Sequence, residues 1–389
     1  MSATLSSSGA ASALPKLARI TSVDALRGLV MIIMAIDHVR DFFHADALVF
    51  GPEDLAKTNA ALFLTRWITH LCAPVFAFTA GIGAYFWARR HGQSPSGMLV
   101  KRGLMLVVLE FTALRFAFFL NKYLEGPIFA TVLWSLGWSM VALAALVYLP
   151  LRALAVVSIA GIALHNLLDG IQGGLWWKIL HQQGAEVLPG IGLFVVAYPL
   201  VPWIFIMSAG YCFGRLLERE ERREWMLRLG AAMTIGFVIL RAINLYGDPR
   251  PWAVQANGLT WASFLSATKY PPSLMFVLMT IGPALLILAV LDRMKFGRNN
   301  PLIVFGNTPL FFFIGHFLLA HLLAWPLAWV RYGTVGFLAN IQPNMGGDIK
   351  LYPPGYGYSL GGMYLIWLLV LVLMYPLCRW YGRRKINVS

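Results

Sequence analysis

The chain has 389 residues, of which 59% are hydrophobic and only 12% are charged, and its mean hydropathy is +0.68. Because soluble domains carry about a quarter of charged residues, this composition excludes an ordinary soluble protein and indicates a polytopic membrane protein. The formal net charge of +14 does not indicate a nucleic-acid partner, since the basic residues lie in short segments between apolar runs.

The first 21 residues differ in composition from the rest of the chain. They are rich in Ser and Ala and contain no apolar run long enough for the core of a signal peptide. We predict that residues 1–21 form a disordered cytoplasmic tail. Residues 22–385 are then one transmembrane domain, whose first helix is an uncleaved anchor.

Ten apolar stretches are long enough to cross a hydrocarbon core, which is about 30 Å thick and needs roughly 20 helical residues. They lie at residues 23–45, 60–88, 102–121, 128–149, 152–168, 191–216, 227–246, 271–291, 301–325 and 360–381. The connections on one side of the membrane contain 20 Lys and Arg residues, and those on the other side contain seven. The positive-inside rule therefore predicts an all-α, multi-pass protein of a bacterial inner membrane, with about ten transmembrane helices and both termini in the cytoplasm.

The first predicted helix contains the segment RGLVMIIMAIDHVRDFFH (27–44), whose last eight positions carry five ionisable residues. They are Asp37, His38, Arg40, Asp41 and His44. At 100° per residue, Asp37, Asp41 and His44 lie within about 60° of one another. Because a carboxylate fixes the tautomer of a neighbouring histidine and raises its basicity, this face is typical of a general base. We predict that His38 is that base and that Asp37 or Asp41 orients it.

Ionisable residues on other predicted helices reach a similar depth, when positions are converted at 1.5 Å per residue. They are Arg66, His70, Glu110, Arg115, Arg241 and His316, with Lys269 at the mouth of the cavity. Because an uncompensated charge in lipid costs several kcal/mol, we expect these groups to face a shared cavity and stabilise negative charge or bind the acceptor. Other roles are possible for four of these residues. Glu110 and Arg115 would then form structural pairs, His316 would pack as an ordinary polar side chain, and Lys269 would be a solvated loop lysine.

The sequence contains no pattern typical of metal ligands. His316 and His321 are five residues apart, which is poor spacing for one helix face. Cys72, Cys212 and Cys378 lie in apolar segments without paired spacing, as packing cysteines do. We therefore predict no metal and no disulfide framework.

Basic residues gather at the predicted cytoplasmic ends of the first helices. They are Arg27, Arg89, Arg90, Lys101 and Arg102. Positive-inside topology is one explanation for them. The other is that they bind the phosphates of a large anionic donor.

Two long connections, 168–190 and 326–360, lie on the opposite side of the membrane by the same count of Lys and Arg residues. They suit either interfacial anchoring or an acceptor-binding lid.

Several segments together resemble one known family. They are SVDALRGLVMIIMAIDHVRDFFH, VKRGLMLVVLEFTALRF, LWSLGWSMVALAALVYLP, HNLLDG, YPLVPW, NLYGDPRPW, TKYPPSLMFVLMTIGPALL and PLFFFIGHFLLAHL. From about Ser22 to the last helix, the chain resembles the bacterial branch of the heparan-α-glucosaminide N-acetyltransferase catalytic-domain family. In the wider set of transmembrane acyltransferases to which that family belongs, an Arg on the first helix is followed, after ten residues, by a catalytic His. Arg27 and His38 have this separation.

The resemblance implies that acetyl-coenzyme A or another acyl-coenzyme A donates its acyl group from the cytoplasmic side. The acceptor would be a hydroxyl or amine of a glycan or a small molecule at the outer face. In heparan-branch relatives, the position of His38 is occupied by Asn, and a catalytic His lies near the position of His44. Both histidines are therefore candidates, with His38 first. Direct transfer and an acyl-histidine intermediate are both open. The implied partners are membrane lipids, donor and acceptor, and a homodimer is left open.

A proton-coupled transporter of a small organic anion is the alternative function, because buried Asp, His and Arg residues also line proton paths. A membrane protein without catalytic activity, whose charges serve helix assembly, is a third alternative. The sequence contains no obvious inverted repeat, and its buried charges are expected in the outer half of the helices and not at the midplane. Both observations favour the enzyme over the transporter.

Overall fold

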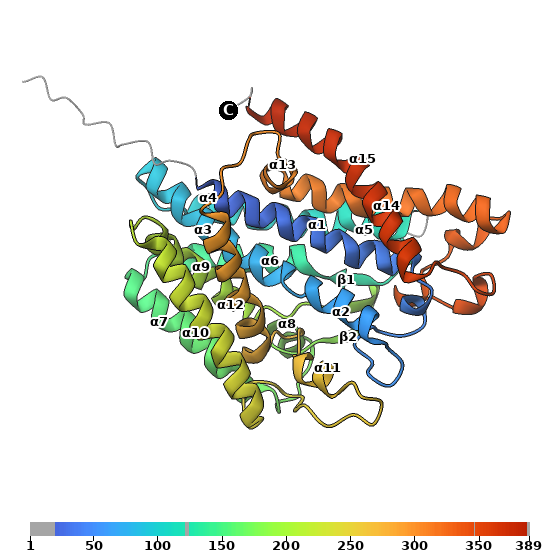
Figure 1. The fold of residues 1–389 in the computed structure, drawn as a ribbon, viewed down its shortest axis with the longest axis horizontal. Coiled ribbons are helices and arrows are strands. Elements are labelled where there is room, and N and C mark those ends of the chain that lie inside the picture. The colour runs from blue at the N-terminus through green and yellow to red at the C-terminus, as the bar shows by residue number, and fades with distance from the viewer. Residues whose placement is uncertain (1–19, 121–123, 346, 387–389) are drawn as a thin grey trace, which may run out of the picture.

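The computed structural model describes residues 20–120, 124–345 and 347–386 (Figure 1). The predicted tail over residues 1–21 therefore lies almost wholly outside the described residues. The helices are α1 (Thr21–Phe43), α2 (Ala60–Thr69), α3 (Cys72–His91), α4 (Ser96–Leu109), α5 (Arg115–Phe119), α6 (Val132–Leu146), α7 (Leu151–Leu164), α8 (Leu175–Leu180), α9 (Trp203–Leu217), α10 (Arg222–Ile243), α11 (Thr260–Leu265), α12 (Leu274–Leu291), α13 (Pro301–Asn307), α14 (Pro309–Tyr332) and α15 (Leu360–Ile386). A π-helical turn over Glu110–Leu114 joins α4 to α5.

Helix α1 runs through the middle of the fold (Figure 1) and packs against α2, α3, α12, α13, α14 and α15. Ala25, Ala35 and Val39 on this helix are fully buried. Gly28 lets α1 approach α13 closely, since a Cβ atom there would lie 1.9 Å from the carbonyl oxygen of Leu302. The ionisable end of α1 therefore lies among other helices. The start of α1 and the end of α15 lie toward the same end of the bundle (Figure 1).

Six helical segments of the described chain are long and apolar enough to cross a membrane. They are Ala60–His91, Leu151–Leu168, Arg222–Ile243, Leu274–Leu291, Pro309–Tyr332 and Leu360–Arg384. Helices α6 and α9 are apolar but shorter, and α1 has 23 residues but carries the ionisable cluster at its end. The chain is thus a multi-pass membrane protein. Ten crossings and the cytoplasmic position of both termini remain predictions.

The prediction that the chain is all-α is wrong in one region, where three short strands form a sheet. They are β1 (Ile128–Ala130), β2 (Gly184–Leu188) and β3 (Gly192–Val196), in the order β1-β3-β2. Strand β3 is parallel to β1, with Phe194 opposite Ile128, and antiparallel to β2, with Phe194 opposite Glu186. Gly190 and Gly192 form the turn between β2 and β3 at φ values of 71° and 96°, which glycine adopts without steric cost.

Two predicted helices begin later than expected because of this sheet. The stretch at 128–149 becomes helical only at Val132, and the stretch at 191–216 becomes helical only at Trp203. A short apolar run that starts such a stretch has no period that distinguishes a buried strand from a helix. Hydropathy alone therefore extended both helices into the sheet.

Other predicted helices are interrupted. The stretch at 301–325 is divided into α13 and α14 at Thr308, because the residue before a proline, here Pro309, avoids the α-helical region. Helix α14 then continues to Tyr332, so the predicted connection at 326–360 begins seven residues later, at Gly333. Residues 70 and 71 likewise separate α2 from α3 within the stretch predicted at 60–88. The helix predicted at 102–121 begins earlier, with α4, and contains the π-helical turn.

Helices α3 and α9 approach each other through Gly81 and Gly210. A Cβ atom on Gly210 would lie 1.9 Å from the carbonyl oxygen of Phe78, so a side chain there must push the two backbones apart. We expect Gly210→Ala to lower the free energy of unfolding by about 1–3 kcal/mol, measured by chemical unfolding in detergent. Gly236→Ala on α10 is the control, because its Cβ would meet no atom within 4 Å. Equal stability of the Gly210→Ala variant and the wild type would contradict this account of the interface.

Candidate active site

Two histidines from different helices meet near the C-terminal end of α1. Nδ1 of His38 on α1 lies 2.6 Å from Nε2 of His316 on α14. His316 is fully buried and His38 is half-buried. The His38 ring stacks on Phe317 with a centroid distance of 3.9 Å, and Phe313 contacts it edge-on at 6.0 Å. These aromatic side chains hold the plane of the His38 ring.

The hydrogen bonds around His316 determine which nitrogen of His38 carries the proton. Nδ1 of His316 lies 2.8 Å from the carbonyl oxygen of Phe312, which can only accept, so Nδ1 of His316 donates. In neutral His316 the other nitrogen, Nε2, is then an acceptor and receives a hydrogen bond from Nδ1 of His38. Neutral His38 therefore has its lone pair on Nε2. This is the arrangement of a general base whose tautomer is held by a second group.

Asp37 lies beside His38 in the chain, but its carboxylate pairs with arginines. Oδ1 of Asp37 lies 2.5 Å from Nη1 of Arg40, and Oδ2 accepts a hydrogen bond from Nη1 of Arg66. Arg66 also donates from Nε to Glu53 at 2.9 Å, and Nε2 of His70 donates to the same oxygen of Glu53 at 2.8 Å. The structure thus joins α1, α2 and the connection between them through buried ion pairs.

Glu53 lies in the connection between α1 and α2. Burial raises the pKa of its carboxyl group, but the Arg66 guanidinium and the hydrogen bond from His70 outweigh that effect. The pKa of Glu53 therefore lies well below its ordinary value. Glu53 is ionised at neutral pH and can hold both Arg66 and His70 in place.

Lys269 precedes α12 and is buried, with only 6% of its surface exposed. Its positive charge acts on both Asp37 and His38. The ammonium group forms no hydrogen bond with any residue that the structure describes, while the neighbouring backbone N–H of Thr268 donates to Asp248 at 2.8 Å. The positive charge of this lysine thus acts on the predicted base, and its burial differs from that of a solvated loop lysine.

The other two predicted catalytic residues lie at the end of α1. Asp41 pairs with Arg40 at 2.7 Å, and its side chain is 30% exposed. Nδ1 of His44 accepts a hydrogen bond from the backbone N–H of Ala47 at 3.3 Å, and the backbone of His44 pairs with Tyr358. These contacts belong to the end of a helix, and they do not involve the His38 ring.

Glu110 was predicted to face the cavity, and its carboxylate caps α6. It accepts hydrogen bonds from the backbone N–H of Thr131 at 2.9 Å, from the Thr131 hydroxyl at 2.6 Å and from the backbone N–H of Trp134 at 3.0 Å. A negative charge is favourable at a helix N-terminus, where backbone N–H groups lack partners. These contacts agree with the structural alternative for Glu110.

Two predicted cavity arginines bind backbone carbonyl groups. Arg115 donates to the carbonyl oxygens of Gly126 and Pro127 at 2.7 and 2.8 Å. Arg241 is buried and donates to the carbonyl oxygens of residues 250, 263, 264 and 266. Each guanidinium thus holds an irregular segment against a helix. None of these hydrogen bonds involves His38.

The predicted donor-binding residues lie near the start of α1. Arg27 pairs with Asp24 at 3.3 Å and donates to the carbonyl oxygen of Thr79 at 3.0 Å. Arg89 is exposed and pairs with Glu218 at 2.8 Å. The side chains of Arg90, Lys101 and Arg102 are exposed around the turn that joins α3 to α4. This turn lies at the end of the bundle where α1 begins (Figure 1).

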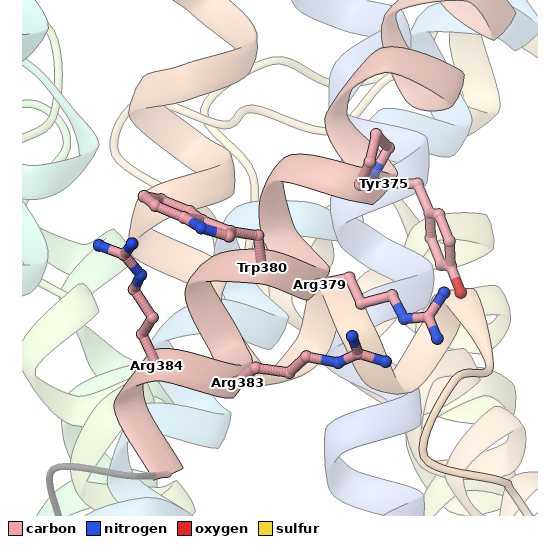
Figure 2. A pocket seen from close by; sticks show the side chains of 6 residues that line it. Tyr375, Arg379, Trp380, Arg383 and Arg384 are labelled. Carbon is pink, nitrogen blue, oxygen red and sulfur yellow. The ribbon is translucent and has the colours of Figure 1, made fainter.

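A second basic cluster, which the sequence analysis missed, lies on the last turns of α15. Tyr375, Arg379, Trp380, Arg383 and Arg384 line a cavity of about 260 Å³. Figure 2 shows Arg379 and Arg383 extending to the same side of α15 as Tyr375. The guanidinium of Arg384 lies 4.4 Å from the centre of the Trp380 ring. In the sequence, Arg383 and Arg384 contributed only to the count of Lys and Arg residues that predicts membrane orientation. Charges that set the orientation and charges that bind an anion have the same sequence pattern.

Arg40 was also missed as a site residue. Its spacing of three residues predicts contact with Asp37 on one helix face. In the structure, Arg40 shares the Asp37 carboxylate with Arg66, which lies on another helix, and the sequence does not show that arrangement. Glu53 lies in a connection and has no local pattern that marks it. The stacking partner Phe317 is one of several phenylalanines around His316, and the sequence does not distinguish among them.

A comparison with known families identifies the family of this chain. A family model described as heparan-α-glucosaminide N-acetyltransferase, catalytic, matches residues 19–243, which is more than half of the chain. The chain belongs to this family. As a member of the heparan-α-glucosaminide N-acetyltransferase catalytic family, it is by implication an acetyltransferase with acetyl-coenzyme A as donor. The match contains His38 and its ion-pair network, whereas Lys269 and His316 follow it. No curated protein matches the chain.

Proposed function

We propose that the protein is a membrane-embedded acyltransferase that moves an acetyl group from acetyl-coenzyme A to a hydroxyl or amine of an acceptor. The observation that carries this proposal is the His38–His316 pair, in which Nε2 of His38 keeps its lone pair; the charge of the buried Lys269 acts on this histidine. Acyl transfer from a thioester needs a base for the acceptor and a positive group for the oxyanion. These three residues supply both.

In the proposed reaction, Nε2 of His38 removes the proton from the acceptor hydroxyl or amine as that atom attacks the thioester carbonyl. The ammonium of Lys269 stabilises the negative charge that develops on the carbonyl oxygen. The C–S bond then breaks, and the proton on His38 passes to the departing thiolate to give free coenzyme A. His316 keeps the His38 tautomer unchanged throughout, because its own Nδ1 donates to the carbonyl of Phe312.

The membrane arrangement that suits this reaction is ten helices over residues 22–385, both termini in the cytoplasm, and a bacterial inner membrane. Arg27 and His38 lie eleven residues apart on α1, a rise of about 16 Å. The pantetheine arm of coenzyme A spans on the order of 15–20 Å by its extended bonds. A nucleotide bound near Arg27, Arg89, Arg90, Lys101 and Arg102 could therefore present its thioester to His38. The family name points to an amino sugar as one acceptor class, and hydroxyl groups of glycans are a second.

A transfer assay tests this function. The purified full-length chain in proteoliposomes should release free thiol from acetyl-coenzyme A when amino sugars or glycans are added, and mass spectrometry should detect acceptors heavier by one acetyl group. Incubation with labelled acetyl-coenzyme A in the absence of acceptor tests for an acyl-enzyme, because the label then becomes attached to the protein. If thiol release is absent and the vesicles instead carry organic anions without coenzyme A, the protein is a transporter and the proposal is wrong.

Replacement of Lys269 tests the oxyanion role separately. We expect Lys269→Met to lower kcat by about 10²–10³-fold, because the variant keeps the length of the side chain but loses the charge. Lys57→Met is the matched control, since Lys57 is a loop lysine whose side chain is 61% exposed. A higher KM with unchanged kcat in the Lys269→Met variant would assign Lys269 to substrate binding and not to the transition state.

A further inference from the structure

A second histidine cluster lies apart from the His38–His316 pair. His165 begins a short 3₁₀ turn, His165–Leu168, that follows α7, and Asp169 comes directly after this turn. His181 follows α8. Both histidines are buried, with 4% and 3% of their surfaces exposed, and the side chain of Asp169 is 16% exposed. Two imidazoles and a carboxylate thus meet under the surface, with the carboxylate toward solvent.

The distances in this cluster are near those between ligands of one metal ion. Nδ1 of His165 lies 3.1 Å from Nε2 of His181, and Nε2 of His181 lies 3.8 Å from Oδ1 of Asp169. The three ligand atoms all lie within 4.8 Å of one another. Around tetrahedral Zn²⁺, with ligand bonds of about 2.0–2.2 Å, neighbouring ligand atoms are about 3.3 Å apart. Small side-chain movements would therefore bring all three atoms onto one ion.

Neighbouring side chains hold Asp169 and His181 in position. The side-chain amide of Asn166 donates to Oδ2 of Asp169 at 2.7 Å, which leaves Oδ1 facing the histidines. The indole of Trp177 stacks on the His181 ring with a centroid distance of 5.5 Å. Partners of this kind, which orient the ligands, are typical of metal sites.

We propose that His165, Asp169 and His181 bind a divalent transition metal ion, with Zn²⁺ favoured by the two imidazoles and one carboxylate. A water molecule would complete the tetrahedron on the exposed side of Asp169. The ion would join the end of α7 to the segment after α8. Asn166 also accepts a hydrogen bond from the backbone N–H of Leu274 at 2.9 Å, so the site is connected to the start of α12.

Metal titration of the purified full-length protein tests this proposal without any measurement of acyl transfer. The chain should carry a purification tag without histidines, be stripped with a chelator and then be titrated with Co²⁺ and Zn²⁺ in detergent. We expect one equivalent to bind, Co²⁺ to give the visible absorption of a tetrahedral site, and Zn²⁺ to displace it and raise the Tm. His91→Ala should bind as the wild type does, because His91 is exposed on α3.

Three substitutions test which residues bind the metal ion and which residue orients a ligand. Asp169→Asn and His181→Ala should weaken binding by more than about 100-fold, whereas Asn166→Ala should weaken it by about 10–100-fold, as loss of an orienting partner does. Asp169→Asn keeps the shape of the side chain, so its Tm without metal shows whether the fold persists. The proposal is overturned if the wild type binds no Co²⁺ or Zn²⁺, or if a folded Asp169→Asn variant binds as tightly as the wild type.

Discussion

Replacement of His38 by alanine is expected to lower kcat for acetyl transfer by about 10²–10⁴-fold, the range that a positioned general base contributes. The variant removes Nε2 of His38, the ring nitrogen on which the hydrogen bonds of His316 leave the lone pair. Binding of the donor should change little, because Arg27 lies eleven residues away at the other end of α1. Steady-state thiol release, with donor affinity measured separately, distinguishes the two effects.

The role of His316 can be tested in the same assay. His316→Ala removes the acceptor for Nδ1 of His38, while His316→Gln keeps an amide oxygen that can accept and an N–H that can donate. The glutamine variant should therefore retain more activity than the alanine variant, and the pH dependence of kcat should shift in both. His91→Ala is the control for loss of an unrelated histidine. Full activity of His38→Ala would remove His38 from the reaction, and His44 would be tested next.

Loss of the Asp37 carboxylate is expected to have the largest effect on stability. Asp37→Asn should lower the free energy of unfolding by about 3–5 kcal/mol, because removal of one partner leaves buried charges uncompensated. Asp37 is only 8% exposed and pairs with both Arg40 and Arg66. The wild-type network also contains Asp41, which pairs with Arg40, and Glu53, which pairs with Arg66.

An exposed ion pair supplies the control for this experiment. Asp54 pairs with Lys57 at 3.6 Å, and their side chains are 38% and 61% exposed. Asp54→Asn should change the free energy of unfolding by less than about 1 kcal/mol, because solvent screens exposed pairs. Chemical unfolding of both variants in the same detergent gives the comparison. If Asp37→Asn is no more destabilising than Asp54→Asn, the buried network does not support the fold in the way its geometry indicates.

The candidate site could be predicted only in part. The ionisable face of α1 was visible because residues on one helix have a known angular relation. For the same reason the prediction assigned Asp37 and Asp41 as the partners of His38, since only neighbours on the same helix could be placed. The observed partner, His316, is 278 positions away in the chain. Asp37 instead neutralises arginines, one of them from α2.

The roles of the remaining buried charges could not be predicted either, because their partners lie on other segments of the chain. Glu110, Arg115 and Arg241 were grouped with the cavity because their depth in a helix can be counted from the sequence. Depth does not determine which direction a side chain faces, and these three bind backbone groups of adjacent segments. The histidine cluster at His165 and His181 was not predicted, because its members lie in a turn and a loop without regular spacing.

The sequence by itself determined the membrane class of the protein, most of its helical segments and the position of the candidate base. These properties are local, because transfer of a segment into lipid and the geometry of one helix depend on neighbouring residues. Only the tertiary structure decided where the sheet replaces the starts of two predicted helices, which histidine faces His38, and that Lys269 is buried. Those features depend on how segments far apart in the chain pack together, and no local pattern records that packing.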